Sequence, residues 1–286
     1  MATKSSPVLN GLSVDVEEWF QVGAFERTIA KADWDTLASR VEANTGAVLD
    51  LFAESGVKAT FFTLGWVAER HPRLIRRIAE AGHEVASHGW DHQRVFTMDA
   101  PAFRADLIRA RTALEDASGQ RVTGYRAPSF SIDTRNLWAF SELAEAGYAY
   151  SSSVAPVAHD HYGWRDAPRY AFRPLKDSPL VELPVTVARI RGRHLATGGG
   201  FFRMLPAALT DFAVRQVNAE GHGGIFYFHP WEIDPGQPRV ADAPLRSRVR
   251  HYARLGAMAG KLRGLIRRHD WGRVDAVVAR EAAALS

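Results

Sequence analysis

Short β-rich runs alternate with helical runs along most of the chain, and this alternation limits the possible folds more than any other feature. Five helical segments are expected to end at glycines, namely Gly56, Gly82, Gly119, Gly147 and Gly221. Glycine suits the left-handed position that follows a helix. Repeated βα units predict a parallel sheet, either open or closed into a barrel.

Runs of β-branched and aromatic residues indicate about seven strands in roughly 230 residues, which suits a distorted α/β barrel. The expected strands are 12–16, 57–63, 83–87, 122–126, 148–154, 181–187 and 225–229. The expected helices are 44–55, 72–81, 101–118, 134–146 and 206–220. A Pro- and Gly-rich stretch at 234–244 is the candidate boundary. We therefore expect a flexible N-terminus (1–10), a barrel domain (11–234) and a helical extension packed on the barrel (235–286).

The net charge of +4 is unevenly distributed. From Arg239 onward the chain has eleven Lys and Arg residues against four Asp and Glu residues. Such a tail can attract nucleic acid, anionic glycan or lipid headgroups. The alternative is a solvated amphipathic helix, which is favoured because the basic residues are interleaved with apolar ones such as Leu255 and Leu262.

The composition also excludes several classes of protein. The chain has no cysteine, so disulfide scaffolds, thiolate metal sites and cysteine nucleophiles are excluded. Residues 1–7 have no apolar core like that of a secretory signal, and no run of about 18 apolar residues occurs. These observations predict a cytoplasmic protein without a transmembrane segment, at most peripheral to a membrane.

Polar residues that close apolar strands are the candidates for chemistry, because sites in parallel βα folds collect at the carboxyl ends of strands. The first such end contains Asp15 and Glu17, which point the same way in an extended chain. Two acids on one face repel unless a cation or a shared proton lies between them. The alternative is a surface acidic run that opens a loop.

The second strand end has the sequence SHGWDH, in which His88 and His92 are four residues apart. This spacing can place two imidazoles on one metal ion, from a helical turn or from a tight loop, although it also occurs by chance. At the other two ends stand Arg126, which can hold a carboxylate or form a structural salt bridge, and His229, which is either catalytic or a buried structural histidine.

Taken together, these ends supply carboxylates and imidazoles, which suit zinc or a similar divalent metal. Two histidines and one carboxylate leave positions open for water and substrate, as hydrolytic metals require. A remaining carboxylate can serve as general base and His229 as general acid.

The ordered series SVDVEEW, ATFF, SHGWDH, GYRAPSF and FYFHP, spread over residues 11–232, resembles the polysaccharide deacetylase family of carbohydrate esterases. This family includes chitin deacetylases and peptidoglycan N-acetylglucosamine deacetylases. The stretches TGGGFFRMLP, HPWEIDP and RHYARL resemble the branch found with bacterial exopolysaccharide and exosortase loci. The resemblance implies a distorted (β/α) barrel and metal-dependent hydrolysis of N-acetyl groups on the amino sugars of an acetylated polysaccharide.

Carried over residue by residue, the resemblance makes Asp15 the general base, His88 and His92 the metal-binding pair, Arg126 the residue that orients the base, and His229 the proton donor to the leaving amine. The sequence departs from the family at two places. Val16 stands where a second, metal-binding aspartate is usual, so we expect Glu17 to replace it, with Glu18 behind it. Ser151 stands where a further acid is expected.

The resemblance also implies a mechanism in which an oxyanion forms. The metal and a backbone amide near Phe130 are expected to stabilise this oxyanion. Three aromatic residues are candidates to pack on sugar rings, or simply to fill the core, namely Trp90, Phe130 and Trp231. The rival functions are a metal-free amide or cyclic-imide hydrolase and a glycan-binding protein without catalysis. Nucleic acid is not an expected partner, because no phosphate loop or reader motif is present.

Overall fold

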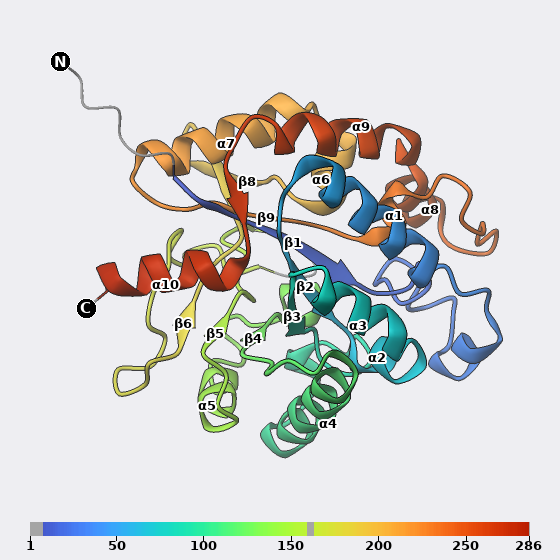
Figure 1. The fold of residues 1–286 in the computed structure, drawn as a ribbon, viewed down its shortest axis with the longest axis horizontal. Helices are drawn as coiled ribbons and strands as arrows, with labels where there is room; N and C mark the ends of the chain where they lie inside the picture. Colours follow the sequence, from blue (N-terminus) through green and yellow to red (C-terminus); the bar gives the residue numbers. More distant parts are fainter. Residues whose placement is uncertain (1–7, 159–162, 286) are drawn as a thin grey trace.

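The computed structural model describes residues 8–158 and 163–285, which form a curled parallel sheet surrounded by helices (Figure 1). The strands of this sheet are β1 (Asn10–Val16), β2 (Thr60–Thr63), β3 (Glu84–Ser87), β4 (Gly124–Tyr125), β5 (Tyr150–Ser151), β6 (Val181–Glu182), β9 (Ile225–Phe228) and β10 (Trp271–Gly272). Strands β1 to β6 pair in chain order, and β9 and β10 both pair with β1.

The two edges of this sheet meet at Thr186, just after β6. Its backbone N–H donates to the carbonyl of Ile225 at the start of β9, over 3.0 Å. The N–H of Ile225 donates in return to the Thr186 hydroxyl, over 2.7 Å. These bonds bring the edges together, so the predicted distorted (β/α) barrel is confirmed.

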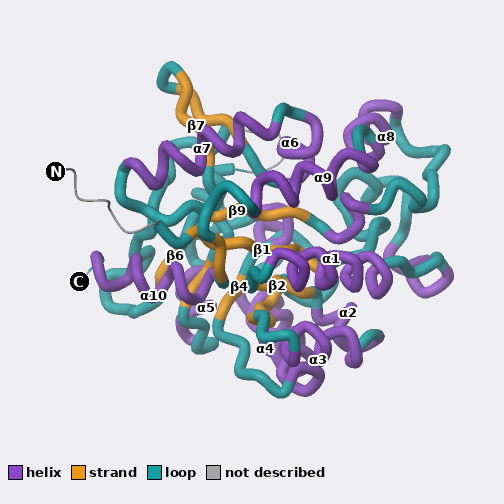
Figure 2. The backbone as a smooth tube through the Cα atoms, turned by 45° about the horizontal axis from the view of Figure 1, so that its top comes forward, coloured by secondary structure: helices purple, strands orange, loops and turns teal. Residues whose placement is uncertain are grey.

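Helices cover the outside of the barrel (Figures 1 and 2). They are α1 (Val41–Ser55), α2 (Gly65–Arg70), α3 (Pro72–Glu80), α4 (Ala100–Ser118), α5 (Ala139–Glu145), α6 (Gly199–Met204), α7 (Ala207–Ala219), α8 (Leu245–Tyr252), α9 (Leu255–Ile266) and α10 (Val274–Ala284). Short 3₁₀ turns occupy Lys31–Thr36, Val95–Thr97, Pro128–Phe130 and Pro230–Ile233. The five predicted helix-ending glycines all have positive φ, from 67° to 92°, as the left-handed position requires.

The strands have apolar side chains on both faces, which is usual for a parallel sheet covered by helices. One apolar cluster lies between the sheet and the helices and includes Leu12, Val14 and Val16 of β1. A second cluster includes Phe62 and Tyr150 together with Val277 of α10. Alternation along β1 therefore directs its apolar residues to the helices and its polar residues, such as Asp15, to the barrel interior.

The basic tail contributes α8, α9, β10 and α10. The apolar residues of α9 are buried, among them Leu255, Leu262 and Ile266, whereas Arg267 and Arg268 are exposed. This arrangement is that of a solvated amphipathic helix. The domain division at residue 234 stays a prediction, and residues 1–7 of the expected flexible N-terminus lie outside the described residues.

Several elements differ from those expected. The strand predicted over 181–187 is split, because Pro184 has no N–H to donate to a ladder. Its second half starts an antiparallel hairpin of β7 (Val187–Ile190) and β8 (Arg193–Ala196), which was not predicted. The helix predicted over 134–146 begins only at Ala139, because the Asn136 side chain closes a turn by bonding the Asp133 N–H and the Ser131 carbonyl.

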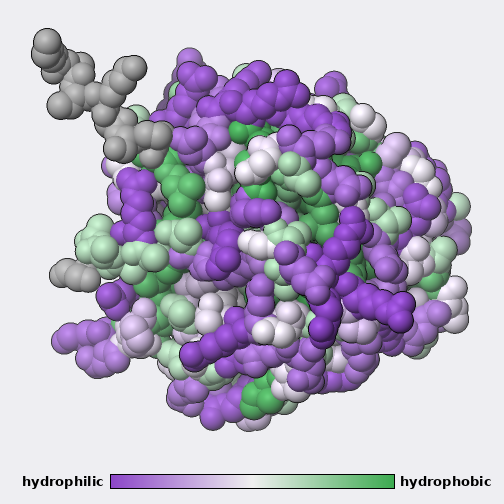
Figure 3. All heavy atoms as spheres, in the orientation of Figure 1, coloured by the Kyte–Doolittle hydropathy of each residue, from purple (hydrophilic) through white to green (hydrophobic). Residues whose placement is uncertain are grey.

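Among the described residues, no helix combines the length and apolar character that a membrane crossing needs. Hydrophilic side chains cover most of the face seen in Figure 3, with hydrophobic residues showing between them.

Candidate functional site

Four strands bring the predicted site residues to one end of the barrel. Asp15 lies on β1, His88 follows β3, Arg126 follows β4 and His229 follows β9. These strands are all parallel, so their carboxyl ends lie at the same edge. Each side chain is buried or nearly so.

The two neighbouring glutamates after β1 point in different directions. Glu17 turns towards the histidines, as the alternation of side chains predicts. Glu18 instead accepts hydrogen bonds from the Ser39 hydroxyl and from the backbone N–H groups of Arg40 and Val41. These groups lie at the start of α1, where N–H groups lack partners within the helix. Glu18 therefore caps α1, and Glu17 is the acid that faces the site.

The three side chains predicted to bind a metal lie together. Glu17, His88 and His92 each offer one ligand atom, and these atoms are all within 4.8 Å of one another. Glu17 Oε2 is 2.9 Å from His92 Nε2, yet it accepts no hydrogen bond from any described residue. A buried carboxylate oxygen without a donor is costly. A divalent cation would satisfy it, so this set of donors fits a metal ion.

His88 is held with one ring nitrogen available. Its Nδ1–H donates to the carbonyl of Arg126 over 2.9 Å, which leaves Nε2 to act as a ligand. Burial lowers the pKa of His88 to about 4, against the opposing charges of Asp15 and Glu17. The imidazole is therefore neutral at pH 7, as metal binding requires.

His92 reaches the cluster from a tight loop, not from a helix. Its backbone has φ of 62°, a left-handed conformation that is uncommon for a residue other than glycine. Two backbone bonds hold the loop against α2, from Gly65 N–H to the Gly89 carbonyl and from Trp66 N–H to the Trp90 carbonyl, both over 2.9 Å. The surrounding structure thus maintains a strained residue at the site.

Burial raises the pKa of Glu17, but electrostatic attraction from the nearby histidines outweighs burial and lowers this pKa to about 2. The Trp231 indole N–H donates to Glu17 Oε1 over 3.1 Å. Glu17 is therefore an anion whose two oxygens have different surroundings, one bonded to an indole and one facing the histidines.

Asp15 is paired with Arg126 in the barrel interior. Arg126 Nη1 donates to Asp15 Oδ1 over 2.7 Å and to the Ser13 hydroxyl over 2.8 Å. The remaining guanidinium groups donate to the carbonyl and hydroxyl of Ser152, and the guanidinium stacks on Phe62 with 4.0 Å to the ring centroid. Arg126 is fully buried and fixed on every side, so it orients the carboxylate of Asp15.

His229 faces both acids of β1. Its Nε2 lies 3.7 Å from Glu17 Oε1 and 4.0 Å from Asp15 Oδ2. Its Nδ1 lies 3.0 Å from Oε2 of Glu232. Burial lowers the pKa of His229, but the charges of Glu17 and Glu232 outweigh burial and raise it to about 9. A protonated imidazole therefore stands beside the cluster.

Sequence reasoning missed Glu232. The residue lies three positions after His229 in the run FHPWEI, which forms one 3₁₀ turn. This spacing was visible in the sequence, but no rule of alternation or strand ends selects it.

The three aromatic residues predicted to contact substrate occupy different surroundings. The ring of Trp231 stacks between His229 and His251, with centroids 5.1 and 4.3 Å away. Phe130 lies near Arg126, 5.5 Å from its guanidinium carbon. The N–H of Phe130 donates to the Ala127 carbonyl over 3.0 Å, so this amide is not available for an oxyanion.

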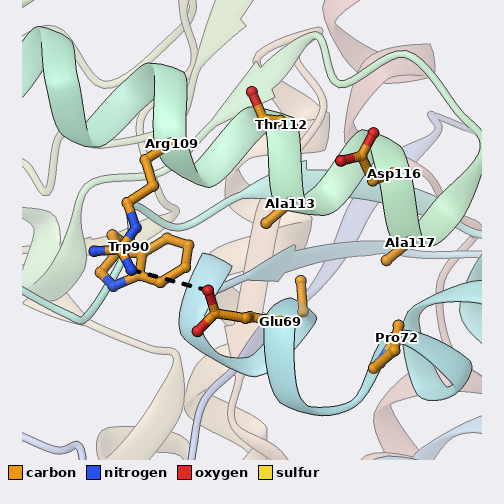
Figure 4. Close-up of a pocket in the computed structure, with 9 residues that line it drawn as sticks. Glu69, Pro72, Trp90, Arg109, Thr112, Ala113, Asp116 and Ala117 are labelled. Atoms are coloured by element: carbon orange, nitrogen blue, oxygen red, sulfur yellow. Dashed lines mark ion pairs between the residues drawn. The ribbon is translucent and has the colours of Figure 1, made fainter.

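Trp90 is not brought to the cluster. Its ring packs against Gly65 and lies under Arg109, whose guanidinium carbon is 3.4 Å from the ring centroid. It lines a surface pocket of about 520 Å³ between α2 and α4, where Glu69 and Arg109 are 3.9 Å apart (Figure 4). Packing between two helices is the role that its position supports.

A serine stands at position 151, where an acid was expected, and a buried acid, Glu182, lies opposite it on the next strand. Ser151 pairs in register with Glu182 on β6. Glu182 accepts the backbone N–H groups of Ser153 and Val154, over 2.9 and 2.8 Å. Burial raises the pKa of Glu182 to about 7. This carboxyl group therefore shapes the loop after β5.

Two family profiles match this chain. Residues 32–150 match "Polysaccharide deacetylase", and residues 152–279 match a domain of unknown function, DUF3473. The site draws on both ranges, because His88, His92 and Arg126 lie in the first range and His229 in the second. Asp15 and Glu17 precede both.

Similar proteins include a chitin deacetylase from Pestalotiopsis sp, 32% identical over 42% of this chain and 40% of the relative. A peptidoglycan-N-acetylglucosamine deacetylase from Listeria monocytogenes is 36% identical over 31% of this chain and 19% of the relative. The chain thus spans less than half the length of these curated relatives.

The crystal structure of a putative polysaccharide deacetylase from Mycobacterium smegmatis has the same fold, with a TM-score of 0.62 and 22% identity over 99% of this chain and 93% of that one. The fold, the ordered motifs and the profile match agree. Residues 32–150 thus match the polysaccharide deacetylase family, and the fold of the whole chain agrees with that match.

Proposed function

We propose that this protein is a metal-dependent deacetylase that hydrolyses N-acetyl groups on amino-sugar residues of a bacterial exopolysaccharide. The observation that carries the proposal is the cluster of Glu17, His88 and His92, in which Glu17 Oε2 accepts no hydrogen bond from a described residue. The names of the relatives, which include chitin and peptidoglycan deacetylases, support the substrate class.

In the proposed site, Glu17, His88 and His92 would hold the metal, with zinc the best match to two imidazoles and one carboxylate. When bound, such an ion polarises the acetyl carbonyl and makes water more acidic. Asp15, fixed by Arg126, takes a proton from the attacking water. His229, whose Nε2 lies 4.0 Å from Asp15 Oδ2, gives a proton to the nitrogen that leaves as an amine.

The test is metal content and acetate release from N-acetylglucosamine oligomers. We expect about one equivalent of zinc per chain after soaking, and acetate release that stops when a chelator removes the metal. His88→Ala is expected to lose metal binding and to lower turnover by at least about 10³-fold. His71→Ala, which alters a histidine outside the cluster, is the matched control and should match wild type.

A fully active His88→Ala protein would contradict the proposal. Activity that survives chelation and acts on cyclic imides would favour the metal-free hydrolase. Saturable glycan binding without acetate release would favour the binding protein. Parallel assays on O-acetylated xylan distinguish ester from amide hydrolysis.

A further inference from the structure

The side chain of Glu232 is buried directly behind the proposed proton donor. It is 0% exposed and lies at the end of the turn that begins after His229. Its Oε2 accepts the backbone N–H of His229 over 3.1 Å and lies 3.0 Å from Nδ1 of the same residue. One carboxylate oxygen therefore binds both the backbone and the ring of His229.

Arg203 fixes the other oxygen of this carboxylate. Its Nε is 3.2 Å from Glu232 Oε1, and the guanidinium is 1% exposed. Its remaining N–H groups donate to carbonyl oxygens at the end of α8 and just beyond it, those of Arg250 over 2.7 Å, Ala253 over 3.1 Å and His251. Because both oxygens are bound, the carboxylate cannot rotate away from the ring.

The orientation of the imidazole follows from these contacts. Nδ1 keeps its hydrogen because it donates to Glu232, so Nε2 is the nitrogen that exchanges a proton. The Trp231 ring, tilted by 20° from the imidazole plane at 5.1 Å, limits rotation from one side. Nε2 is thereby held towards Asp15 and Glu17.

We propose that Glu232, fixed by Arg203, is the positioning residue that holds His229 for proton donation to the leaving amine. The inference rests on the proposed function. As the carbon–nitrogen bond breaks, its electron pair passes to nitrogen, which takes the proton from Nε2. The Nδ1–H stays on the ring and remains bonded to Glu232. The proton lost by water resides on Asp15 and can later restore the imidazolium.

No other described carboxylate contacts His229 Nδ1. Glu182, the acid opposite position 151, binds backbone N–H groups of the loop after β5 instead. The second half of the chain, whose profile has no assigned function, thus supplies the histidine, its carboxylate and the arginine that fixes it.

The experiment compares two leaving groups. Release of an amine needs a proton, whereas release of 4-nitrophenolate does not. In Glu232→Gln we expect kcat for acetate release from N-acetylglucosamine oligomers to fall at least about 10²-fold. KM and bound zinc should change less than about threefold, and hydrolysis of 4-nitrophenyl acetate should change equally little.

Glu281→Gln is the matched control, because Glu281 is also a buried glutamate bound to a histidine, with 2.8 Å to His222 Nδ1, and it lies on α10 outside the site. It should leave both reactions unchanged. If Glu232→Gln does not fold, Glu232→Asp keeps the charge but shortens the side chain, and the same selective loss on the amide substrate is expected.

Equal losses on both substrates, or an unchanged amide kcat, would overturn the positioning role. Wild-type protein that releases no acetate from any acetylated glycan would overturn the proposed function itself, so the two failures are distinguishable.

Discussion

The two ends of the barrel bury acids in opposite ways. At the carboxyl end of the strands, Glu17 has its pKa lowered to about 2, because electrostatic attraction from the nearby histidines outweighs burial. At the other end, Glu84 at the start of β3 has its pKa raised to about 7 by burial and by the nearby charge of Asp275. Burial acts in the same direction on both carboxyl groups. The neighbouring charges decide which acid is an anion.

The partners at each end explain this difference. Glu84 binds the hydroxyls of Thr60 and Tyr150, the latter over 2.8 Å, and the N–H of Asp275 over 3.3 Å. All of these donors are uncharged, and they fasten the start of α10 to the end of the barrel. The carboxyl end of the strands therefore holds anions beside cations, whereas at the amino end a buried acid with uncharged donors attaches α10 to the barrel.

The largest effect on stability and activity is expected at the carboxyl end of the strands. Arg126→Met leaves Asp15 buried without its cation, which should lower the free energy of unfolding by about 3–5 kcal/mol. The misplaced base should also lower kcat by at least about 10²-fold. Urea unfolding and acetate release measure the two effects.

Arg77→Met is the control, because the Arg77–Asp50 pair is exposed, with side chains 54% and 71% accessible. It should change stability by less than about 1 kcal/mol. If Arg126→Met lost no more stability than this control, the carboxyl end of the barrel would not depend on the Arg126–Asp15 ion pair.

The next effect is the pH dependence of stability at the amino end of the strands, where Glu84 lies. The pKa of Glu84 is raised from 4.5 to about 7 in the folded protein, so the folded state binds a proton that the unfolded state has released. Its contribution to stability is complete below pH 4.5 and is lost as pH rises through 7. The loss is up to about 3 kcal/mol.

Glu84→Gln cannot titrate, so the gap between its stability and that of wild type should change between pH 4 and pH 8. Urea unfolding at both pH values measures this gap, and kcat should be unchanged. A gap that is constant with pH would show that Glu84 is already ionised in the folded protein.

The smallest effect is expected from Thr60→Val. The Thr60 hydroxyl accepts the N–H of Val274 at the start of α10, over 2.7 Å. Valine has nearly the same shape but cannot accept this bond, so stability should fall by about 1–2 kcal/mol with no change in kcat. Thr112→Val on the exposed face of α4 should stay within about 0.5 kcal/mol of wild type. Lost activity in Thr60→Val would indicate that the two ends are coupled.

The site was more predictable than its opposite end. Strand alternation and strand ends are local patterns, so Asp15, Glu17, His88, Arg126 and His229 could be selected from short runs of sequence. Glu84 could not, because its partner Asp275 is 191 residues away. Glu232 was also missed, since its role depends on Arg203, which reaches it from another element.

The fold shows the same division. Glycine-terminated helices were confirmed because each helix end is set by its own residues. The two-residue strand β10 was not predicted, because it exists only where Trp271 and Gly272 meet β1. Elements shorter than a hydrophobic repeat are defined by their neighbours.

The pairing of β1 has a consequence for synthesis of the chain. The strand that bears Asp15 is synthesised before two strands that pair with it, β9 and β10, which lie at 225–228 and 271–272. Until the last of these is made, the strand keeps unpaired N–H and carbonyl groups, which invite association with other chains. Chains truncated before residue 271 should therefore aggregate more readily than chains that include β10.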